Sequence, residues 1–395
     1  MSQPVVYVVS AARTAIGSFG GALKDVPLAA LATTAVKAAL ARSGVAPEEV
    51  GHVALGNVIP TEPRDAYLSR IAAIDAGLPK EVPAFNVNRL CGSGLQAIVS
   101  AAQSLMLGDA ELAIGGGAES MSRGPYLMTA GRWGIRMGDS TLLDYTVGVL
   151  QDPFGRIHMG VTAENVAARF GIDRAAQDAL ALASHQRAVA AIAAGRFAEQ
   201  IVPVEIALRK GPIVFDTDEH PRADTTLESL AKMKPAFKKE GGSVTAGNAS
   251  GINDGAGAVM LATEAAVKRL NLVPLARLVG YAHAGVEPEL MGIGPVPATR
   301  AALQRAGLKV GDLDVIEANE AFAAQACAVA RELDLDPAKV NPNGSGISLG
   351  HPIGATGAII VVKAIHELRR VGGRYALATM CIGGGQGIAA IFERA

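Results

Sequence analysis

The sequence has few cysteines, few aromatic residues and almost no net charge. Three cysteines in 395 residues, with no Cys-x-x-Cys pair, argue against a disulfide framework or a structural zinc site and favour a reducing compartment. A formal net charge of -1 gives no electrostatic reason to expect nucleic acid, whose binding depends on neutralising phosphates. We therefore expect a cytoplasmic protein with no metal and no nucleic-acid partner.

The sequence also lacks the marks of a targeting segment or a membrane span. Residues 1–4 have neither the charged nor the apolar region of a signal peptide, and they lead directly into a strand-like run at residues 5–9. No apolar run approaches the roughly 18 to 20 residues needed to cross a bilayer. We expect a soluble, unprocessed protein with no membrane partner.

Two parts of the chain alternate short apolar strands with helical stretches. Residues 1–120 do so, and residues 274–395 repeat the alternation, which is the signature of an α/β layer fold. Arg42-Ser43-Gly44 matches Arg305-Ala306-Gly307 at an offset of 263 (305 less 42), and Ile114-Gly115-Gly116-Gly117 matches Ile382-Gly383-Gly384-Gly385 at an offset of 268 (382 less 114). These echoes indicate a duplicated unit whose equivalent loops meet about a pseudo-twofold axis.

Residues 121–250 differ from both halves. Proline, glycine and arginine occur there in irregular order, interrupted by an amphipathic helix at about residues 173–195. Four lysines and no acid occur between Lys232 and Lys239. We interpret the segment as an insert that builds a binding surface; the lysines are either solvated or suited to a phosphate-bearing ligand.

Cys91 lies between a strand-like run at residues 82–87 and a helical stretch at residues 95–107. The positive end of a helix favours the thiolate, which is the nucleophilic form of cysteine. Gly92 and Gly94 would let backbone and substrate approach the sulfur closely. The alternative is a buried, inert cysteine, because cysteine also packs as a small apolar residue.

Three further loops carry groups that can act with a cysteine. Asn319, His351 and Cys381 are each predicted to follow a strand, where open α/β sheets collect their active sites. A cysteine and histidine pair supports acyl transfer through a thioester, and a second cysteine can transfer a proton. Cys327 falls within an alanine-rich helix, so we expect it to serve packing.

Other catalytic motifs fail. Gly346-Ile347-Ser348-Leu349-Gly350 fits a nucleophile elbow, which would imply a hydrolase. That fold requires an acid and then a histidine after the serine, yet no Asp follows Ser348 and no Glu precedes His351 or His366 after it. A phosphate-binding loop, a dinucleotide fingerprint and a His-Glu-x-x-His zinc motif are also missing from the sequence.

Taken in order, these motifs resemble those of the thiolase family over the whole chain, specifically the biosynthetic acetyl-CoA C-acetyltransferase and β-ketothiolase class. The turn at residues 152–165 is similar to β-ketothiolases of bacterial polyhydroxyalkanoate synthesis, and Cys381 separates the chain from ketoacyl synthases. The motifs that carry the resemblance are Asn88–Ala97, Thr245–Gly251, Asn319–Phe322 and Gly350–Gly357.

The resemblance implies a five-layered αβαβα fold made of two duplicated halves plus a loop domain. The halves would be residues 1–120 with 251–273, and residues 274–395. Residues 121–250 would form the loop domain over the coenzyme A tunnel. The resemblance also implies a homotetramer.

It further implies a role for each reactive group. Cys91 would be the acylated nucleophile, His351 its activator, and Cys381 the group that moves the α-proton. Asn319, through a water, and His351 would hold the enolate oxygen, and the N–H groups of Cys91 and Gly383 would hold the thioester oxygen. The chain would bind no permanent cofactor, because coenzyme A and acyl-CoA are its substrates. Residues that would contact coenzyme A are Ser250, Arg222, His158, Met159, Phe237 and Phe322.

Two interpretations as an enzyme remain, and one as a binding protein. As a biosynthetic enzyme, the chain would condense two acetyl-CoA molecules, or acetyl-CoA with a short acyl-CoA. Alternatively, it would be a degradative 3-ketoacyl-CoA thiolase of fatty-acid oxidation. The different class is a non-catalytic acyl-CoA-binding protein, which the intact set of four reactive groups disfavours. Met291 and residues 126–128 are candidates for the end of the acyl tunnel.

Overall fold

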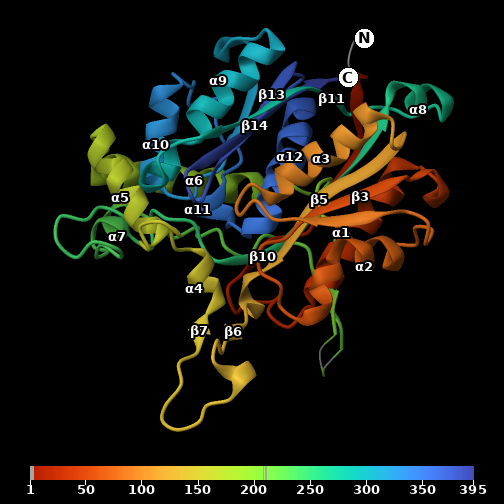
Figure 1. Cartoon of the computed structure of the whole chain (residues 1–395). Helices are drawn as coiled ribbons and strands as arrows, with labels where there is room; N and C mark the ends of the chain where they lie inside the picture. The colour runs from red at the N-terminus through yellow and green to blue at the C-terminus, as the bar shows by residue number, and fades with distance from the viewer. Residues whose placement is uncertain (1–3, 208, 210) are drawn as a thin grey trace.

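A computed structural model describes residues 4–207, 209 and 211–395. Within these residues, ten strands form one mixed sheet, ordered β12-β13-β14-β11-β1-β10-β5-β3-β4 with β2 beside β10 (Figure 1). The strands of this sheet are β1 (Val6–Arg13), β2 (Gly17–Ser18), β3 (His52–Gly56), β4 (Ala84–Val87), β5 (Leu112–Ser120), β10 (Asn253–Thr263), β11 (Ala276–Gly285), β12 (Val315–Ala318), β13 (Tyr375–Ile382) and β14 (Gln386–Arg394).

The sheet consists of two halves with the same topology, joined at β1 and β11. Outward from that joint the order is β1-β10-β5-β3 on one side and β11-β14-β13-β12 on the other. The first two pairings in each half are antiparallel and the third is parallel. The predicted duplication is therefore confirmed.

The strand register gives the offset between the halves. Val53 of β3 pairs with Ile114 of β5, and Ile316 of β12 pairs with Leu377 of β13. Both residues of the second pair lie 263 positions later (316 less 53, 377 less 114), as the echo at Arg42 and Arg305 predicted. The echo at offset 268 is wrong, because Ile114 lies inside β5 whereas Ile382 ends β13.

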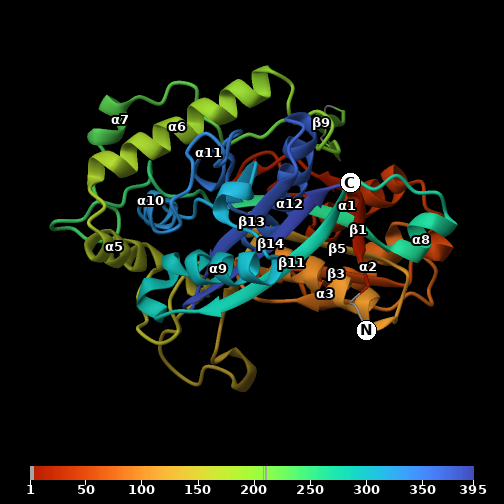
Figure 2. The same ribbon diagram turned by 90° about the horizontal axis from the view of Figure 1, so that it is seen from above.

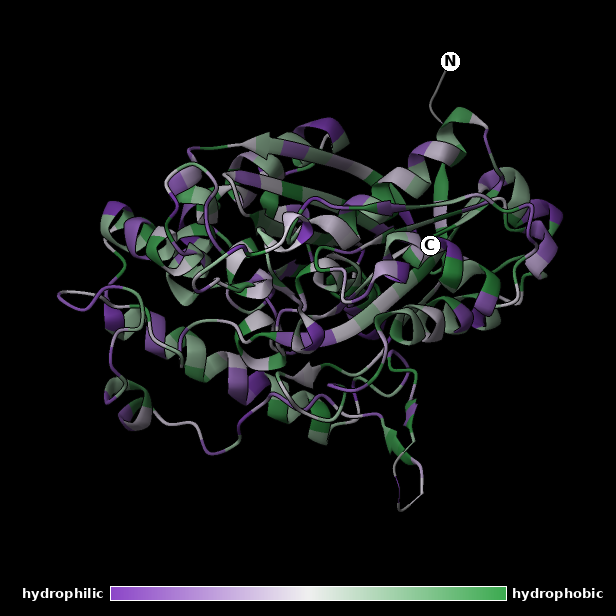
Figure 3. Ribbon diagram, turned by 60° about the horizontal axis from the view of Figure 1, so that its bottom comes forward, coloured by the Kyte–Doolittle hydropathy of each residue, from purple (hydrophilic) through white to green (hydrophobic). Residues whose placement is uncertain are grey.

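Helices complete a five-layered αβαβα arrangement, as expected from the resemblance. The helices α1 and α2 cover the first half-sheet, α9 and α10 cover the second, and α3 and α12 pack against each other between the two halves (Figure 2). These elements are α1 (Leu28–Ser43), α2 (Leu68–Asp75), α3 (Ser93–Leu107), α8 (Glu264–Arg269), α9 (Pro295–Ala306), α10 (Ala323–Glu332), α11 (Gly346–Leu349) and α12 (Ile353–Arg370). Hydrophilic and hydrophobic residues alternate along the outer helices, as expected for helices with one solvated face (Figure 3).

The central helices approach closely because glycine occurs where they meet. A Cβ on Gly357 of α12 would lie 2.2 Å from the backbone nitrogen of Leu95 in α3. A Cβ on Gly94 of α3 would lie 2.7 Å from the nitrogen of Ala358. The chain segments that start these two helices are therefore held side by side.

One expectation about apolar runs is wrong. The 18-residue stretch Leu90–Leu107 is long and apolar enough to cross a membrane by length and composition, and it was the one such stretch found among the described residues. It contains α3, which packs between the two half-sheets, so its apolar character follows from its place in the central layer.

The described residues of 121–250 form helices and short strand pairs on the outside of the layers. The helix α6 begins after Asp173, whose carboxylate accepts the N–H of Ala176 at 2.8 Å. The β6–β7 pair begins an arm that projects from the bottom of the molecule in Figure 1. The elements are β6 (Tyr126–Leu127), β7 (Leu143–Asp144), α4 (Tyr145–Val149), α5 (Met159–Phe170), α6 (Arg174–Ala193), β8 (Val204–Ile206), β9 (Ile213–Phe215) and α7 (Leu227–Ala231).

Candidate active site

Cys91 stands in the turn from β4 to α3, as predicted. The hydroxyl of Ser93 holds this turn, because it donates to the carbonyl of Leu90 at 2.6 Å and accepts the N–H of Arg89 at 2.8 Å. Leu90 adopts a φ of +45°, a conformation that costs energy for a residue other than glycine and is concentrated at functional sites. A Cβ on Gly92 would lie 2.4 Å from the side chain of Ile382, so this glycine allows the β13 loop to approach Cys91.

Cys381 and Gly383 reach the same place from the end of β13. The N–H of Gly383 and the N–H of Cys91 itself both act on the Cys91 thiol and lower its pKa. The charge that Cys91 would carry raises the pKa of the Cys381 thiol, after the larger effect of burial. The structure therefore brings the two predicted cysteines and Gly383 together.

The expectation that the helix terminus would favour the Cys91 thiolate is wrong in this structure. Burial raises the pKa of the Cys91 thiol to about 11, and the negative charge of Glu119 adds to the increase. The two backbone N–H groups oppose this shift without cancelling it. Cys91 is a neutral thiol at neutral pH, so it needs a base in order to act as a nucleophile.

His351 is buried, and its hydrogen bonds define its tautomer. The hydroxyl of Thr356 donates to the carbonyl of Pro352 at 2.9 Å, so at 2.7 Å from His351 Nδ1 it must accept a hydrogen bond. The proton is therefore on Nδ1, and Nε2 carries a lone pair. Burial lowers the pKa of His351 to about 4, so the ring is a neutral base at pH 7.

The loop at His351 is fixed by Asn253, which the sequence did not single out. Its side-chain oxygen accepts the N–H of His351 at 3.0 Å, and its amide donates to the carbonyl of Gly17 at 3.0 Å. Gly350 has a φ of +107°, and a Cβ there would lie 2.4 Å from Asn253. His351 follows the short helix α11 rather than a strand, so the predicted strand end at this position is wrong.

Asn319 directs its amide nitrogen at His351. Nδ2 of Asn319 lies 3.5 Å from Nε2 of His351, which agrees with an unprotonated Nε2. The side-chain oxygen of Asn319 is buried and has no hydrogen-bond partner among the described residues. Asn319 therefore provides an N–H donor beside the basic Nε2 of His351.

Five of the six residues expected to contact coenzyme A form a band beside these loops. The ring of His158 stacks on Phe237 at 4.7 Å between centroids, and Phe237 meets Phe322 edge-on at 6.1 Å. The backbone N–H of Ser250 donates to the carbonyl of Ala321, which precedes Phe322. Met159 would lie 2.9 Å from a Cβ on Gly383, so the band ends at the reactive groups.

Arg222 lines a cavity of about 290 Å³ in the insert, together with His185, His220 and Gly251. Gly251 directly follows Ser250 of the band in the chain. Met291 is buried in the same apolar cluster as Cys381 and Met159. Residues 126–128 are exposed in the single chain at the base of the arm, and their place at the tunnel end stays a prediction.

The rival serine motif has no free nucleophile. Ser348 lies inside α11, is fully buried, and its hydroxyl meets that of Ser184 at 2.8 Å. Cys327 lies in α10 with its sulfur 3.8 Å from the carbonyl of Ala176, consistent with the packing role expected for it.

Comparison with known proteins identifies the family. Residues 6–265 match the family described as Thiolase, N-terminal domain, and residues 272–394 match Thiolase, C-terminal domain.

The chain belongs to the thiolase family.

Relatives of this thiolase cover nearly its whole length. It is 68% identical to beta-ketothiolase BktB of Cupriavidus necator over 98% of this chain and 99% of the relative. It is 52% identical to an acetyl-CoA acetyltransferase of Pseudomonas aeruginosa, again over 98% and 99%. The crystal structure of human mitochondrial 3-ketoacyl-CoA thiolase in complex with CoA is similar, with a TM-score of 0.96, 48% identity, and coverage of 99% of this chain and 98% of that one.

Sequence reasoning missed the buried polar residues that hold the thiolase loops in place. Glu119, Asn253 and Thr356 are each less than 4% exposed, and each binds backbone or a side chain in a catalytic loop. A polar residue inside an otherwise apolar strand was the available signal for Glu119 and Asn253. Thr356 lies five residues after His351, a separation that places two residues on no common helix face, and it gave no such signal.

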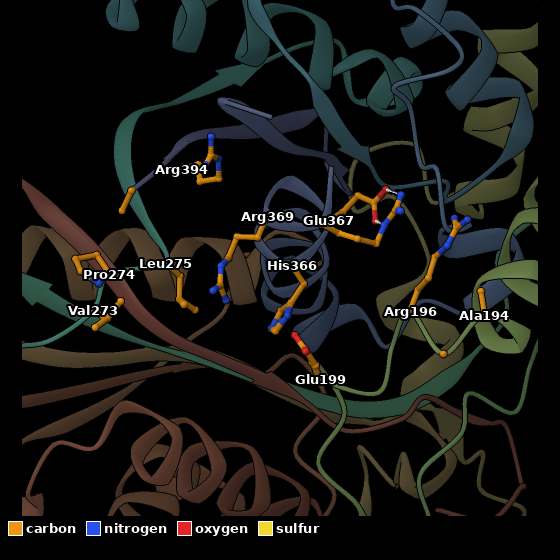
Figure 4. Close-up of a pocket in the computed structure, with 13 residues that line it drawn as sticks. Ala194, Arg196, Glu199, Val273, Pro274, Leu275, His366, Glu367, Arg369 and Arg394 are labelled. Atoms are coloured by element: carbon orange, nitrogen blue, oxygen red, sulfur yellow. Dashed lines mark hydrogen bonds and ion pairs between the residues drawn. The ribbon is translucent and has the colours of Figure 1, made fainter. Parts of the chain in front are cut away.

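A larger cavity of the thiolase than the one at Arg222 lies away from these loops. About 680 Å³ in volume, it opens at the far end of α12, among His366, Arg369 and Glu199 (Figure 4). Three other arginines there are already engaged, Arg370 with Glu367, Arg196 with Asn343, and Arg394 with backbone carbonyls. Its charges are thus largely paired within the protein, and it contains none of the predicted site residues.

Proposed function

We propose that this chain is an acetyl-CoA acetyltransferase and β-ketothiolase that works through an acyl thioester on Cys91. The observation that supports the proposal is a pair of neighbouring thiols, Cys91 and Cys381, beside the start of α3, which contacts the start of α12 just after a neutral His351 whose Nε2 carries no proton. This set contains a nucleophile, a base and a second proton carrier. Its 68% identity to beta-ketothiolase BktB supports the same assignment.

In the acylation step, the Cys91 sulfur attacks the thioester carbonyl of acetyl-CoA while its proton passes to Nε2 of His351. The carbon–sulfur bond to coenzyme A breaks, and the departing thiolate takes the proton of Cys381. The products are acetyl-Cys91, free coenzyme A, a Cys381 thiolate and a His351 imidazolium. The positive ring offsets the charge of the buried Cys381 thiolate.

In the condensation step, the Cys381 thiolate removes an α-proton from the second acyl-CoA. The resulting enolate attacks the carbonyl of acetyl-Cys91 and forms the new carbon–carbon bond. The Cys91 thiolate leaves and recovers its proton from His351, which restores the starting enzyme. Thiolysis is the same sequence in reverse.

Developing negative charge needs donors at two positions. We assign the thioester oxygen to the N–H groups of Cys91 and Gly383, which both point at the Cys91 sulfur. We assign the enolate oxygen to Nε2–H of the protonated His351 and, through a water, to Asn319. Donors of this kind commonly contribute roughly 10² to 10³ in rate.

The band of predicted coenzyme A contacts gives the substrate path. His158, Met159, Phe237, Phe322 and Ser250 would hold the pantetheine arm, and Arg222 would lie toward the phosphates. The exposed lysines that flank Phe237 favour an anionic ligand at the mouth. In this assignment residues 121–250 cover the tunnel, and the two halves, residues 1–120 with 251–273 and residues 274–395, supply the catalytic loops.

The direct test is a steady-state assay with acetyl-CoA alone, and with coenzyme A plus 3-ketoacyl-CoA of increasing chain length. We expect acetoacetyl-CoA formation and thiolysis of short 3-ketoacyl-CoA. A preference confined to long chains would favour the degradative alternative. Binding of acyl-CoA with no turnover in either direction would make the protein a non-catalytic member of the fold.

A labelling experiment tests the nucleophile. One equivalent of iodoacetamide is expected to modify Cys91 before Cys327 and to abolish activity, because Cys91 has a neighbouring base whereas burial raises the pKa of Cys327 to about 11 with no base assigned to it. Tryptic mapping after partial inactivation measures both sites. Equal labelling, or full activity after Cys91 is blocked, would contradict the assignment.

We also propose a homotetramer, on two surfaces. The edge strand β4 ends the sheet with Phe85 41% exposed, and the arm carries Trp133 at 88% and Met137 at 95% exposure. Free strand edges and clustered apolar side chains are typical of association surfaces.

Light scattering after size exclusion is expected to give the mass of four chains. Deletion of the arm tip, residues 129–141, should leave a dimer that retains the β4 contact. A monomeric intact protein at micromolar concentration would contradict the proposal.

A further inference from the structure

The carboxylate of Glu119 is buried where the two catalytic helices begin. Glu119 lies on β5, is 0% exposed, and its side-chain oxygens accept four N–H groups. Oε1 accepts from Asn57 Nδ2 at 2.7 Å and from the N–H of Ile59 at 3.0 Å. Oε2 accepts from the N–H of Val58 at 3.1 Å and from that of Gly354 at 2.8 Å.

These partners connect separate parts of the site. Gly354 is in the first turn of α12, three residues after His351, where a negative charge also interacts favourably with the helix dipole. Val58 and Ile59 belong to an apolar cluster against which Cys91 packs. Glu119 thus links the segment that carries His351 to the segment that supports Cys91.

Gly354 and the glycines around it lie so close to neighbouring atoms that a side chain at these positions would clash. A Cβ on Gly354 would lie 2.5 Å from Oε2 of Glu119. A Cβ on Gly117 or Gly56 would lie 2.2 or 2.8 Å from the carbonyl of Gly354, and the Gly56 Cβ would also lie 2.5 Å from the carbonyl carbon of Ser93, at the start of α3. The beginnings of α3 and α12 are therefore in contact, and the carboxyl group of Glu119 lies at that contact. Burial raises the pKa of Glu119 to about 8, and the N–H groups of Ile59, Gly354 and Val58 oppose the increase because they stabilise the ionised form.

We propose that Glu119 is a positioning residue that fixes His351 relative to Cys91 through the start of α12 and the turn at residues 57–59. The inference rests on the roles proposed for Cys91 and His351. Each carboxylate oxygen faces two donors, so an amide at this position would direct its NH₂ group at other N–H groups. Glu119→Gln should therefore loosen the contact even though the side chains are nearly the same size.

The pH dependence of Cys91 alkylation tests this inference, because it reports on the pair directly and needs no turnover. In the parent, transfer of the thiol proton to neutral His351 should make the rate independent of pH in the neutral range. In Glu119→Gln the rate should instead rise about tenfold per pH unit, as expected for reaction through the free thiolate alone. We also expect kcat to fall by about 10², with little change in KM for coenzyme A.

The titratable groups that face Glu119 are Cys91 and Asp254. Because the charge of Glu119 raises the pKa of Cys91, its loss would also increase the thiolate fraction. Unfolding would increase that fraction too, by ending the burial of the thiol, so the profile is measured on a variant whose cooperative thermal unfolding shows it to be folded. The matched control is Glu111→Gln, which removes a carboxylate exposed to solvent and paired with Arg269 just before the same strand. It should keep the flat profile.

A flat profile in a folded Glu119→Gln protein would overturn the inference. If that variant does not fold, Asn57→Ala, which removes one of the four donors, takes its place and must show a weakened plateau; an unchanged plateau would overturn the inference as well. A parent protein without a plateau would instead contradict the proposed pairing of Cys91 with His351.

Discussion

Cys381→Ala is expected to abolish condensation while leaving Cys91 able to accept an acetyl group. Condensation requires removal of a proton from carbon, and Cys381 is the group assigned to that step; loss of a general base typically costs roughly 10² to 10⁴ in rate. Acylation removes no proton from carbon, so it does not need Cys381 as a base. His351 can protonate the departing coenzyme A in place of Cys381. The variant should therefore accumulate acetyl-Cys91, visible by intact mass after mixing with acetyl-CoA.

Exchange of the α-hydrogens measures the same step without condensation. With acetyl-CoA deuterated at the α-carbon, the parent should exchange the deuterium for solvent hydrogen, and Cys381→Ala should not. Cys327→Ala is the matched control, because it removes a partly buried thiol from α10, outside the reactive set, and it should retain both reactions. Some slowing of acylation is expected, since effects of residues that act as a unit are not additive. Near-normal exchange in Cys381→Ala would make this residue a packing residue.

His351→Ala is expected to change how the rate of Cys91 alkylation depends on pH. Burial raises the pKa of the Cys91 thiol to about 11, so at pH 7 only a fraction of about 10⁻⁴ is thiolate without help. The neutral His351, whose pKa is lowered to about 4, supplies a base across the whole range between these two values. Alkylation should be nearly independent of pH in the parent and should rise about tenfold per pH unit in the variant.

The sign of this effect follows from the two pKa shifts. Lowering the pH below about 4 protonates His351 and removes the base, so the parent should lose its plateau only there, if it remains folded. Raising the pH toward 11 ionises Cys91 directly, and the two proteins should converge. Identical profiles at neutral pH would mean that His351 does not accept the thiol proton.

Part of this site was predictable because two of its four reactive residues, Cys91 and His351, are flanked by glycine. Gly92 and Gly350 mark places where the backbone turns or packs too closely for a side chain, and both proved to have that reason in three dimensions. The offset of 263 was readable because Gly44 and Gly307 end equivalent helices in the left-handed conformation. Conformations that only glycine adopts easily can therefore be predicted from sequence.

The electrostatics of the site could not be read in the same way. The pKa of Cys91 depends on how deeply the turn is buried and on Glu119, which is 28 residues away (119 less 91) in another strand. A helix terminus is a local feature visible in sequence, whereas burial is a property of the assembled layers. The resulting prediction of a thiolate was therefore wrong, and the burial of Cys91 in the structure explains why the base predicted at His351 is needed.

Residues that fix the loops were missed for a related reason. Asn253 and Glu119 lie on strands β10 and β5, far along the chain from the loop they hold. Their importance comes from which backbone N–H groups lie next to them after folding, not from their neighbours in sequence. The match of residues 114–117 with residues 382–385, at an offset of 268, was misleading because a run of glycines can recur in a glycine-rich chain without structural equivalence.

The central claim is that Cys91 carries the acyl group. The most direct measurement is to mix the parent enzyme with acetyl-CoA, quench it in acid, and map the modified peptide by mass spectrometry. We predict one acetyl group per chain on the peptide that contains Cys91, removed again by added coenzyme A. An enzyme that turns over with no acetylated peptide, or with the acetyl group on Cys381, would contradict the account.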